Sequence, residues 1–351
     1  MRLLPAATHL AFLLRSSLLM ANSQFPTGPR EEDMPEGESL AGKYRVERVL
    51  GAGGMGVVVR VTPLEGEGLF ALKFLRPSVA RDPVAAKRFL REAAAAGRIE
   101  SPHVVKISDV GELASGTPYL VMEYLEGATL DERLAAEPRL PLEQACDLAL
   151  QIAQGLAAAH AMGVIHRDIK PANLYVLRGP DGEDLLKIAD FGVSKILDPD
   201  GPEGQALTRT QTSIGSPLYM APEQMRSART ADARADQWSL GAVLYRMVSG
   251  HLPFDAKSLP RLCVQVLTAD FVPVATRCPE LPAEFAAAVE RCFRLEPAER
   301  YADVAELAEA LVPFAGPGGS VRANRCRAIL RAGGPARTTG PRPEVPTDPT
   351  S

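Results

Sequence analysis

A short polar run, residues 166–173, carries side chains suited to moving a phosphoryl group. Its sequence is His-Arg-Asp-Ile-Lys-Pro-Ala-Asn, and an Asp-Phe-Gly sequence follows at 190–192. Asp168 can accept the proton of an attacking hydroxyl, and Lys170 can neutralise charge on the transferred group. Asn173 and Asp190 offer the oxygen ligands that Mg²⁺ prefers. The spacing therefore predicts phosphoryl transfer from ATP, provided that the rest of the chain supplies a nucleotide site.

His166 is a second candidate for the proton acceptor, because histidine is the side chain most often used as a general base. We favour a packed, hydrogen-bonded structural role for His166 and assign the proton to Asp168. The reason is the set of charged residues before and after this run, which are those that accompany a carboxylate in phosphoryl transfer.

A glycine-rich segment lies upstream, where residues 50–58 contain Gly-x-Gly-x-x-Gly between two predicted strands. The pattern alone is weak, since hairpin turns show it as often as phosphate-binding loops do. A dinucleotide-binding fingerprint must open a helix, whereas residues 57–61 continue as a strand. Glycine lets backbone N–H groups approach a triphosphate closely, so we expect an ATP-binding hairpin. Its predicted nucleotide contacts are Leu50, Gly51, Ala52, Gly53, Gly54, Met55, Gly56, Val57 and Val58.

Lys73 lies in a short apolar strand predicted over 69–75, where a lysine is costly to bury unless it is paired. A helix is expected over about 83–98, with Asp82 as its N-cap and a proline in its first turn. Glu92 on this helix is the natural partner of Lys73, and the pair would hold the α- and β-phosphates. Taken alone, an exposed lysine and a solvated glutamate are the commoner case. The glycine loop and the later acids favour the pair.

The composition is that of a soluble globular protein, with 46% hydrophobic and 23% charged residues in 351. A net charge of −4 lacks the basic footprint of nucleic-acid binding. The five cysteines are widely spaced and include no Cys-x-x-Cys pair. Neither a zinc site nor a disulfide framework is therefore expected.

Residues 3–20 are rich in leucine, and a signal peptide is one interpretation of this segment. Pro5 and Arg15 interrupt the run, which leaves it too short to span a bilayer. A start codon assigned too early, with Met20 or Met34 as the true start, explains the segment at least as well. No other run reaches about 18 apolar residues, so we expect a cytoplasmic enzyme with no integral membrane segment.

Residue patterns divide the chain into four parts. Residues 1–43 are expected to be a disordered leader, and residues 44–124 alternate as strands do, around one main helix. Residues 125–312 carry apolar residues at helical spacing. The Gly-, Pro- and Arg-rich residues 313–351 are expected to be a disordered basic tail. These parts predict an α+β fold, with a small β-rich lobe, a larger helical lobe and the charged motifs at their junction.

The motifs, and their order along the chain, resemble those of a Hanks-type protein kinase, of the serine/threonine kind found in bacteria. The resemblance covers about residues 44–312 and includes Met-Ala-Pro-Glu at 220–223, Asp-Gln-Trp-Ser-Leu-Gly at 236–241 and Arg300. It implies the bilobal protein kinase fold, with ATP and Mg²⁺ as cofactors and Mn²⁺ as an alternative metal. It also implies a buried Glu223–Arg300 ion pair, and an Asp236 that anchors the backbone of the catalytic loop.

The resemblance implies where adenine would bind. Residues 119–125 are similar to the strand and hinge that join the two lobes. Tyr175 departs from the aliphatic residue usual at its position, and its ring should stack on the purine. The implied lining consists of Val58, Ala71, Met122 as gatekeeper, the backbones of Glu123 and Leu125, and Tyr175.

Two sequences are typical of kinases that phosphorylate serine and threonine in proteins. Lys170 is followed by proline, and Gly-Ser-Pro at 215–217 resembles the Gly-Thr-Pro of the family. Ser216 would contact Asp168 and Lys170 and favour small hydroxyl acceptors. Proteins with serine or threonine acceptors are therefore the expected partners, and nucleic acid is not.

The segment after the Asp-Phe-Gly sequence carries hydroxyl residues that can be phosphorylated. In such kinases Arg167 can pair with a phosphate there, and the added charge of about −1.5 to −2 would order the segment. We expect autophosphorylation at Thr208 or Thr210, with Thr212 a weaker candidate, in trans within a kinase-domain dimer. The alternative is a flexible segment whose threonines are never modified.

Two other functional classes are open to a chain of this kind. A pseudokinase scaffold usually lacks Lys73, Asp168 or Asp190, and all three are present. A small-molecule kinase of related fold generally lacks the Ala-Pro-Glu sequence found at 221–223. The sequence favours a protein kinase over both, and it identifies neither the substrates nor the activating signal.

Overall fold

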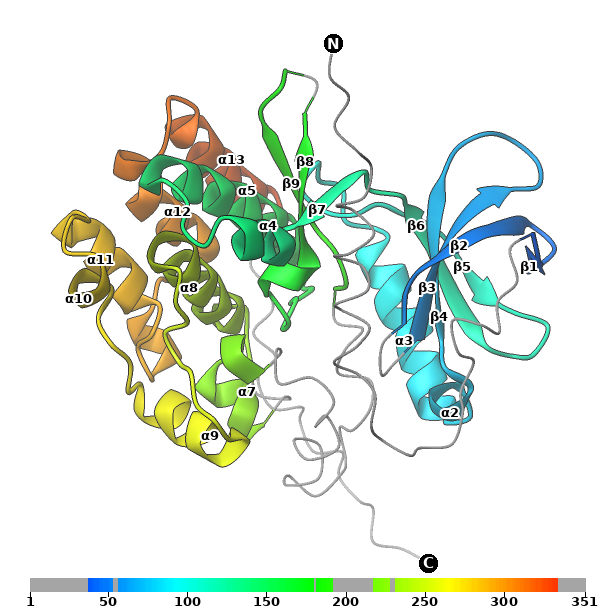
Figure 1. The fold of residues 1–351 in the computed structure, drawn as a ribbon, viewed down its shortest axis with the longest axis horizontal. Coiled ribbons are helices and arrows are strands. Elements are labelled where there is room, and N and C mark those ends of the chain that lie inside the picture. The colour runs from blue at the N-terminus through cyan, green and yellow to red at the C-terminus, as the bar shows by residue number, and fades with distance from the viewer. Residues whose placement is uncertain (1–36, 53–55, 180, 192–216, 228–230, 334–351) are drawn as a thin grey trace, which may run out of the picture.

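The computed structural model describes residues 37–52, 56–179, 181–191, 217–227 and 231–333, which form a strand-rich lobe and a larger helical lobe (Figure 1). The predicted α+β, two-lobed fold is confirmed. Several predicted site residues lie outside the described residues: Gly53, Gly54, Met55, Gly192, Thr208, Thr210, Thr212 and Ser216.

The small lobe is built on a six-stranded antiparallel sheet in the order β1-β2-β3-β4-β6-β5. Alternate side chains of each strand point to opposite faces, and valines of the third strand bury one of these faces against Leu72. β2 and β3 are the two strands predicted on either side of the glycine segment, and they pair as far as Ala52 and Val57. The strands are β1 Ser39–Leu40, β2 Tyr44–Ala52, β3 Gly56–Pro63, β4 Phe70–Leu75, β5 Ile107–Glu112 and β6 Pro118–Glu123.

Helix α3, Pro83–Ala96, is the main helix of this lobe and follows the short α2, Pro77–Ala80. Its N-cap is Asp82, whose side chain accepts a hydrogen bond from the Val84 N–H, as the sequence predicts. Phe89 and Ala93 lie four residues apart on one helical face and are fully buried with Leu75 and Leu120. This packing fixes the position of Glu92 beside the sheet.

A three-stranded antiparallel sheet in the order β7-β8-β9 lies between the lobes. The strands are β7 Gly127–Thr129, β8 Leu174–Arg178 and β9 Asp184–Ile188. A 3₁₀ turn over Pro171–Asn173 runs directly into β8, and β9 ends two residues before Asp190. Both predicted metal ligands, Asn173 and Asp190, therefore lie at the same end of this sheet.

The large lobe is formed around α5 and α8, which are buried along nearly their whole length. Trp238 of α8 stacks on Phe254 with ring centroids 5.1 Å apart, and Phe293 meets both rings edge-on. No helix in the described part of the chain is long and apolar enough to span a membrane. The helices are α4 Leu130–Ala136, α5 Leu142–Ala161, α7 Pro222–Arg226, α8 Arg234–Ser249, α9 Leu259–Thr268, α10 Val274–Arg277, α11 Ala283–Arg291, α12 Val304–Leu311 and α13 Gly319–Ala332, with 3₁₀ turns at Pro217–Tyr219, Pro297–Glu299 and Val312–Phe314.

The boundaries predicted for the ordered domain differ from those in the structure at both ends. Residues 313–351 were predicted to be a disordered basic tail, but Gly319–Ala332 forms α13, which packs on α5 and α12. Ala323 and Cys326 bury one face of this helix, and two of its arginines, Arg322 and Arg327, pair with acids of the lobe. At the other end, β1 extends the sheet into the predicted leader 1–43.

The docking of α13 predicts opposite results for two neighbouring alanines of this helix. Ala323 is buried and Ala328 is exposed. Ala323→Asp should bury an unpaired carboxylate and lower the free energy of unfolding by about 3 kcal/mol or more, whereas Ala328→Asp should change it by less than about 0.5 kcal/mol. Urea denaturation measures both. Equal losses in the two variants would show that α13 does not dock as described.

Candidate active site

Asp236, in the first turn of α8, holds the backbone of the polar run 166–173, called the catalytic loop from here on. One carboxylate oxygen accepts the His166 N–H at 3.0 Å, and the other accepts the Arg167 N–H at 2.7 Å. His160 supplies a third hydrogen bond, with Nε2 2.8 Å from the carboxylate. The anchoring role that the kinase resemblance implied for Asp236 is confirmed in its geometry.

The anchored backbone adopts an unusual conformation. Arg167 has φ of 65° and Asp190 has φ of 61°, a left-handed region that costs residues other than glycine about 1–3 kcal/mol. At Arg167 the N–H donates to Asp236, and the carbonyl accepts a hydrogen bond from Gln224 of α7 at 3.0 Å. The surrounding hydrogen bonds therefore fix the backbone at the residue before Asp168.

His166 is completely buried and both of its ring nitrogens are engaged. Nε2 lies 2.9 Å from the Ala189 carbonyl, which can only accept, so Nε2 carries the proton. Nδ1 accepts the Asp168 N–H at 3.2 Å, and the ring packs on Phe191 with centroids 4.5 Å apart. The predicted packed, hydrogen-bonded histidine is confirmed, and neither nitrogen is left to receive a proton from a substrate.

Asp168, Lys170 and Asn173 form one hydrogen-bonded group. Lys170 Nζ donates to Asp168 Oδ2 at 2.8 Å. Asn173 Nδ2 donates to the Asp168 carbonyl at 2.8 Å and to Oδ2 at 3.1 Å. The amide nitrogen is thereby directed at Asp168, and the opposite atom of the same amide, Oδ1, is directed away from it. The predicted acid, lysine and amide are thus brought together on one short turn.

Lys73 of β4 pairs across the lobes with Asp190. Its Nζ lies 2.7 Å from Asp190 Oδ1, and the two side chains are 12% and 35% exposed. Burial alone would raise the pKa of the Asp190 carboxyl, but the charge and hydrogen bond of Lys73 hold this pKa below its ordinary value. Asp190 is therefore ionised at neutral pH, as a metal ligand must be.

The predicted Lys73–Glu92 ion pair is not formed in this structure, where Lys73 pairs with Asp190 instead. Glu92 Oε2 is buried and, within the described residues, accepts no hydrogen bond. Burial raises the pKa of Glu92, while the charges of Arg88, Arg167 and Arg91 lower it in part. Two acids compete for one lysine, and the lysine pairs with Asp190.

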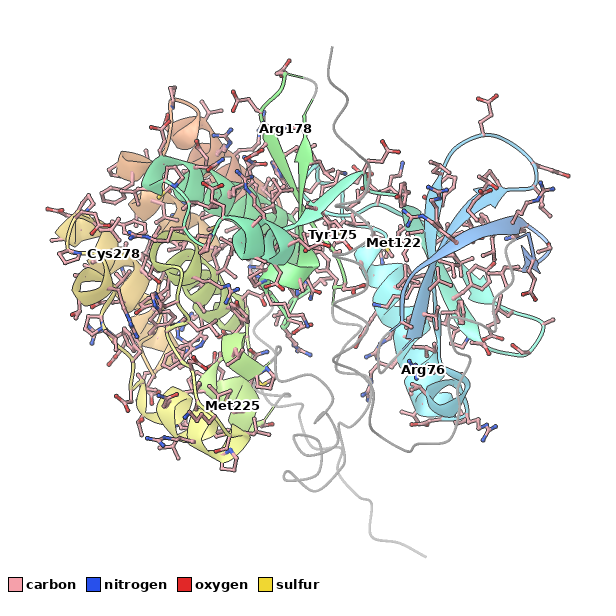
Figure 2. The ribbon with its side chains drawn as sticks, in the orientation of Figure 1. Arg76, Met122, Tyr175, Arg178, Met225 and Cys278 are labelled. Carbon is pink, nitrogen blue, oxygen red and sulfur yellow. The ribbon has the colours of Figure 1, made fainter. Side chains whose placement is uncertain are left out.

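The residues predicted to surround adenine come from both lobes. Ala71 pairs with Met122 across β4 and β6, and Tyr175 lies on β8 at the other side of the lobe junction (Figure 2). Met122 also lines a small apolar cavity with Phe191 and Asp190. Glu123 is fixed by Lys187, whose Nζ lies 2.7 Å from Oε1. Ala71 and Met122 are thus neighbours in the small-lobe sheet, and their grouping with Val58, Leu125 and Tyr175 around adenine stays a prediction.

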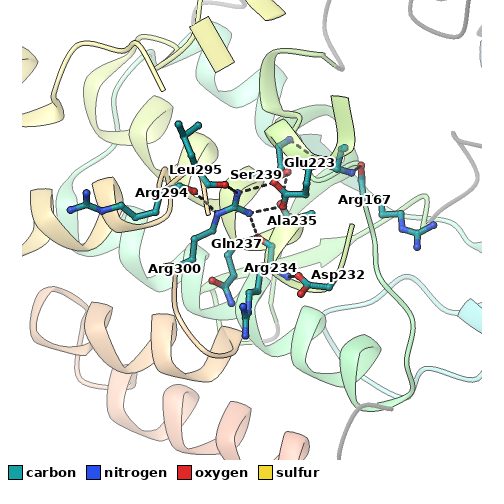
Figure 3. Close-up of polar contacts among 12 residues, drawn as sticks. Arg167, Glu223, Asp232, Arg234, Ala235, Gln237, Ser239, Arg294, Leu295 and Arg300 are labelled. Atoms are coloured by element: carbon teal, nitrogen blue, oxygen red, sulfur yellow. Dashed lines mark hydrogen bonds and ion pairs between the residues drawn. The ribbon is translucent and has the colours of Figure 1, made fainter. Parts of the chain in front are cut away.

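The Ala-Pro-Glu segment is tied to the large lobe by Arg300, as the resemblance implied (Figure 3). The guanidinium donates two hydrogen bonds to the Glu223 carboxylate, at 2.6 and 2.8 Å, and is 1% exposed. It also donates to the carbonyls of Arg234 and Arg294 and lies over the Trp238 ring. Such a bidentate, fully satisfied pair is rigid, so Glu223 fixes the start of α7.

Sequence reasoning missed three residues that shape the site: His160, Gln224 and Gln151. His160 hydrogen-bonds Asp236, and Gln224 donates to the Arg167 carbonyl. Gln151 hydrogen-bonds the backbone of β9. Two of the three lie on α5 among apolar residues, where a buried histidine or glutamine is a detectable signal. The signal indicates only that a partner exists, since the partner comes from a distant part of the chain.

The donor atoms present suit a magnesium ion carried by a triphosphate. Mg²⁺ usually binds one or two protein oxygens and takes its remaining ligands from phosphate and water. Asp190 and Asn173 Oδ1 supply such oxygens. No cluster of three or more His, Cys, Asp or Glu able to hold a metal occurs among the described residues, so a self-contained protein site is not found there.

The protein kinase domain family matches residues 44–311, which include every strand from β2 to β9 and every described helix through α12. The chain belongs to this family. The family match ends before α13, so that helix lies outside it.

Bacterial kinases are among the similar proteins. Serine/threonine-protein kinase pkn3 of Myxococcus xanthus is 36% identical over 274 residues, which cover 78% of this chain and 49% of pkn3. Serine/threonine-protein kinase PknB of Mycobacterium tuberculosis is 34% identical over 276 residues, or 78% of this chain and 43% of PknB. The chain thus spans half or less of the length of these relatives.

Solved structures of the family share the fold. The crystal structure of the PknI kinase domain from Mycobacterium tuberculosis has 28% sequence identity to this chain and a TM-score of 0.61. The match covers 79% of this chain and 97% of that domain. The family therefore accounts for the two-lobed fold.

The buried Asp236 predicts a pH dependence of stability. Burial alone would raise the pKa of Asp236, but His160 and the Arg167 N–H hold it below its ordinary value. The unfolded value is about 3.9, so the carboxylate stabilises the fold fully above about pH 5 and loses this contribution as the pH falls through its depressed folded-state pKa. Asp236→Asn should lower the free energy of unfolding by about 3 kcal/mol at pH 7.

Urea titrations of both proteins between about pH 3 and pH 7 measure this difference. We expect the difference in free energy of unfolding between wild type and Asp236→Asn to shrink below about pH 4. The exposed Asp270 provides the control, because Asp270→Asn should leave a small gap at every pH. A gap at Asp236 that does not change with pH would contradict the assigned role of its charge.

Proposed function

We propose that this chain is a serine/threonine protein kinase, which transfers the γ-phosphate of ATP to serine and threonine hydroxyls of proteins. The observation that carries the proposal is the hydrogen-bonded group of Asp168, Lys170 and Asn173 on an anchored loop, with the Lys73–Asp190 pair beside it. Membership of the protein kinase family and the names of the bacterial relatives support it.

Asp168 is the catalytic base in this proposal. Lys170 and Asn173 both donate to its Oδ2, which holds the carboxylate in one orientation. A serine or threonine hydroxyl that approaches it passes its proton to the carboxylate as the oxygen attacks the γ-phosphorus; the bond from this phosphorus to the β,γ-bridging oxygen breaks, and ADP leaves. Lys170, 2.8 Å from the same oxygen, would neutralise charge on the transferred group.

ATP and Mg²⁺ are the proposed cofactors, with Mn²⁺ as an alternative metal. Bound Mg²⁺ would neutralise the charge of the β- and γ-phosphates. Asp190 and Asn173 would hold the metal. Lys73 would then leave Asp190 for the α- and β-phosphates and pair with Glu92, whose buried Oε2 is without a hydrogen bond among the described residues. Backbone N–H groups of the β2–β3 hairpin would cover the phosphates.

Adenine is proposed to bind between Ala71 and Val58 of the small lobe and Tyr175 of the large lobe, where the phenol ring stacks on the purine. The backbones of Glu123 and Leu125 would meet the edge of the base, and Met122 would close the back of the pocket. The larger ring of Tyr175, where relatives usually have an aliphatic residue, predicts inhibitor affinities that differ from theirs.

Protein substrates are the proposed partners, together with a second kinase domain for trans-autophosphorylation. A cytoplasmic location and the absence of nucleic-acid binding are proposed from the need for ATP and from the net charge of −4. Phosphorylation after the Asp-Phe-Gly sequence would place a dianion near Arg167, whose buried Nε has no hydrogen-bond partner among the described residues.

The assigned base predicts the kinetics of Asp168→Asn. Loss of the proton acceptor should lower kcat for a generic basic protein substrate by about 10²–10⁴, with the protein still folded. Transfer of radiolabel from ATP measures kcat, and phosphoamino acid analysis should find serine and threonine only. The exposed Asp270→Asn is the matched control and should retain wild-type activity.

Three results would contradict this function. Wild-type protein that labels neither itself nor the substrate points to a pseudokinase. Label on a small molecule, with none on protein, points to the small-molecule class. Full activity in Asp168→Asn would remove the base from the mechanism.

Autophosphorylation predicts modified threonines in the recombinant active protein. Phosphate should be found on Thr208 or Thr210, less often on Thr212, because a dianion there can pair with Arg167 and order the segment. Mass spectrometry of intact protein and its peptides detects it. Protein carrying Asp168→Asn, made in the same way, should lack the phosphate. Active wild-type protein with none of the three threonines phosphorylated would refute the expectation.

A further inference from the structure

Helix α13 lies beyond the family match and is nevertheless fixed firmly to the large lobe. It packs along α5 and α12 (Figure 1). Arg322 Nη1 lies 2.9 Å from Asp147 of α5, and Arg327 Nη1 lies 2.8 Å from Asp303, the N-cap of α12. Two separate ion pairs therefore hold α13 to α5 and to α12. Of these two helices, α5 extends to the catalytic loop, where its His160 hydrogen-bonds Asp236.

That neighbour, α5, carries two buried glutamines on an otherwise apolar surface. Gln151 is 4% exposed and Gln154 is 3% exposed, and a buried amide is costly unless its hydrogen bonds are made. Gln151 bonds β9 twice, since its Nε2 donates to the Asp184 carbonyl at 3.0 Å and its Oε1 accepts the Leu186 N–H at 2.8 Å. Gln154 faces the other way, and its Nε2 donates to the Arg322 carbonyl of α13 at 3.2 Å.

His103, in the link between α3 and β5, lies between Gly155 of α5 and β9. It is 7% exposed, and its Nδ1 donates to the Leu186 carbonyl at 2.9 Å. Its own carbonyl accepts the Ile188 N–H at 2.9 Å. The side chain of Gln154 thus reaches α13, while the next residue of α5, Gly155, lies against His103.

α5 packs closely against the segment between α3 and β5. A Cβ atom added to Gly155 would lie 2.9 Å from the His103 carbonyl oxygen and 2.7 Å from Ile188 Cδ1. A displacement of α5 is therefore passed directly to His103 and to β9.

β9 is consequently held on both edges. One edge pairs with β8. The other edge is bonded by Gln151 and His103, at positions that end two residues before Asp190. The backbone that presents Asp190 thus depends on side chains of α5 and on the link before β5.

We propose that α13 is a positioning element for Asp190, acting through α5 by a buried polar chain. In this chain the Arg322 carbonyl binds Gln154, the adjacent Gly155 packs on His103, and His103 and Gln151 bond β9. Gln154 and His103 are then positioning residues of the kinase site, although neither touches substrate or nucleotide. The inference rests on the proposed function only where it takes Asp190 as the metal ligand. The mechanical link from α13 to β9 stands or falls separately.

The test uses the full chain with the substitution Gln154→Leu, which keeps the size of the side chain and removes its hydrogen bonds. Arg327→Gln is the matched control, because it removes contacts of α13 with α12 and leaves the polar chain intact. A deletion of residues 317–351 removes α13, and a deletion of 334–351 is its control. If the larger deletion does not fold, Gln154→Leu decides alone.

The first measurement is amide hydrogen exchange of the peptide that contains β9, in protein without nucleotide or metal. Gln154→Leu should speed exchange at Leu186 and Ile188 by about threefold or more, and Arg327→Gln should not. Combining Gln154→Leu with the deletion of α13 should add little further exchange, because both act on one chain. Unchanged exchange, or equal changes in Gln154→Leu and Arg327→Gln, would overturn the proposal.

The second measurement is the Mg²⁺ concentration that gives half-maximal phosphoryl transfer. A displaced Asp190 should raise it by about threefold or more in Gln154→Leu and leave it unchanged in Arg327→Gln. A merely structural role would lower the melting temperature without moving this concentration, and that result would also overturn the proposal. A wild-type protein without any phosphoryl transfer would contradict the proposed function instead, and the exchange data would still decide the link.

Discussion

One buried carboxylate, Asp236, is the constraint on which the site depends. It is fully buried and accepts hydrogen bonds from His160 and from the backbone of His166 and Arg167. A buried charge is tolerated only when such bonds compensate for lost hydration. The catalytic loop must therefore run past α8 in one conformation, with Arg167 held at φ of 65°, and Asp168 follows at once.

The chemistry of the candidate active site depends on a second constraint, the competition of the Asp190 and Glu92 carboxylates for Lys73. These three side chains come from three separate elements: β4, the residues just after β9, and α3. Lys73 pairs with Asp190, and Glu92 carries a buried oxygen with no hydrogen bond among the described residues. A triphosphate and its metal supply the opposite charges that would let Lys73 change partner. The pairing seen here thus leaves room for a nucleotide-driven rearrangement.

The sequence predicts much of the fold and site, because the relevant signals are local. The spacing within the catalytic loop brings Asp168, Lys170 and Asn173 onto one turn, and the N-cap at Asp82 starts α3. The ordered motifs of the family implied the Asp236 anchor and the Glu223–Arg300 pair, both of which the structure contains. The failures are choices between distant partners. Nothing in the sequence says which acid Lys73 prefers, and the arginines of α13 indicate a disordered tail until their acids on α5 and α12 are known.

The central claim is that the charged groups between the lobes form an ATP site. Its most direct test is a crystal structure with Mg²⁺ and a non-hydrolysable ATP analogue. The metal should be bound by Asp190 and Asn173, with Lys73 Nζ on the phosphates and within about 4 Å of Glu92. Tyr175 should stack on the adenine. A nucleotide bound elsewhere, or one bound here with Lys73 still paired to Asp190 and no metal between Asp190 and Asn173, would contradict the account.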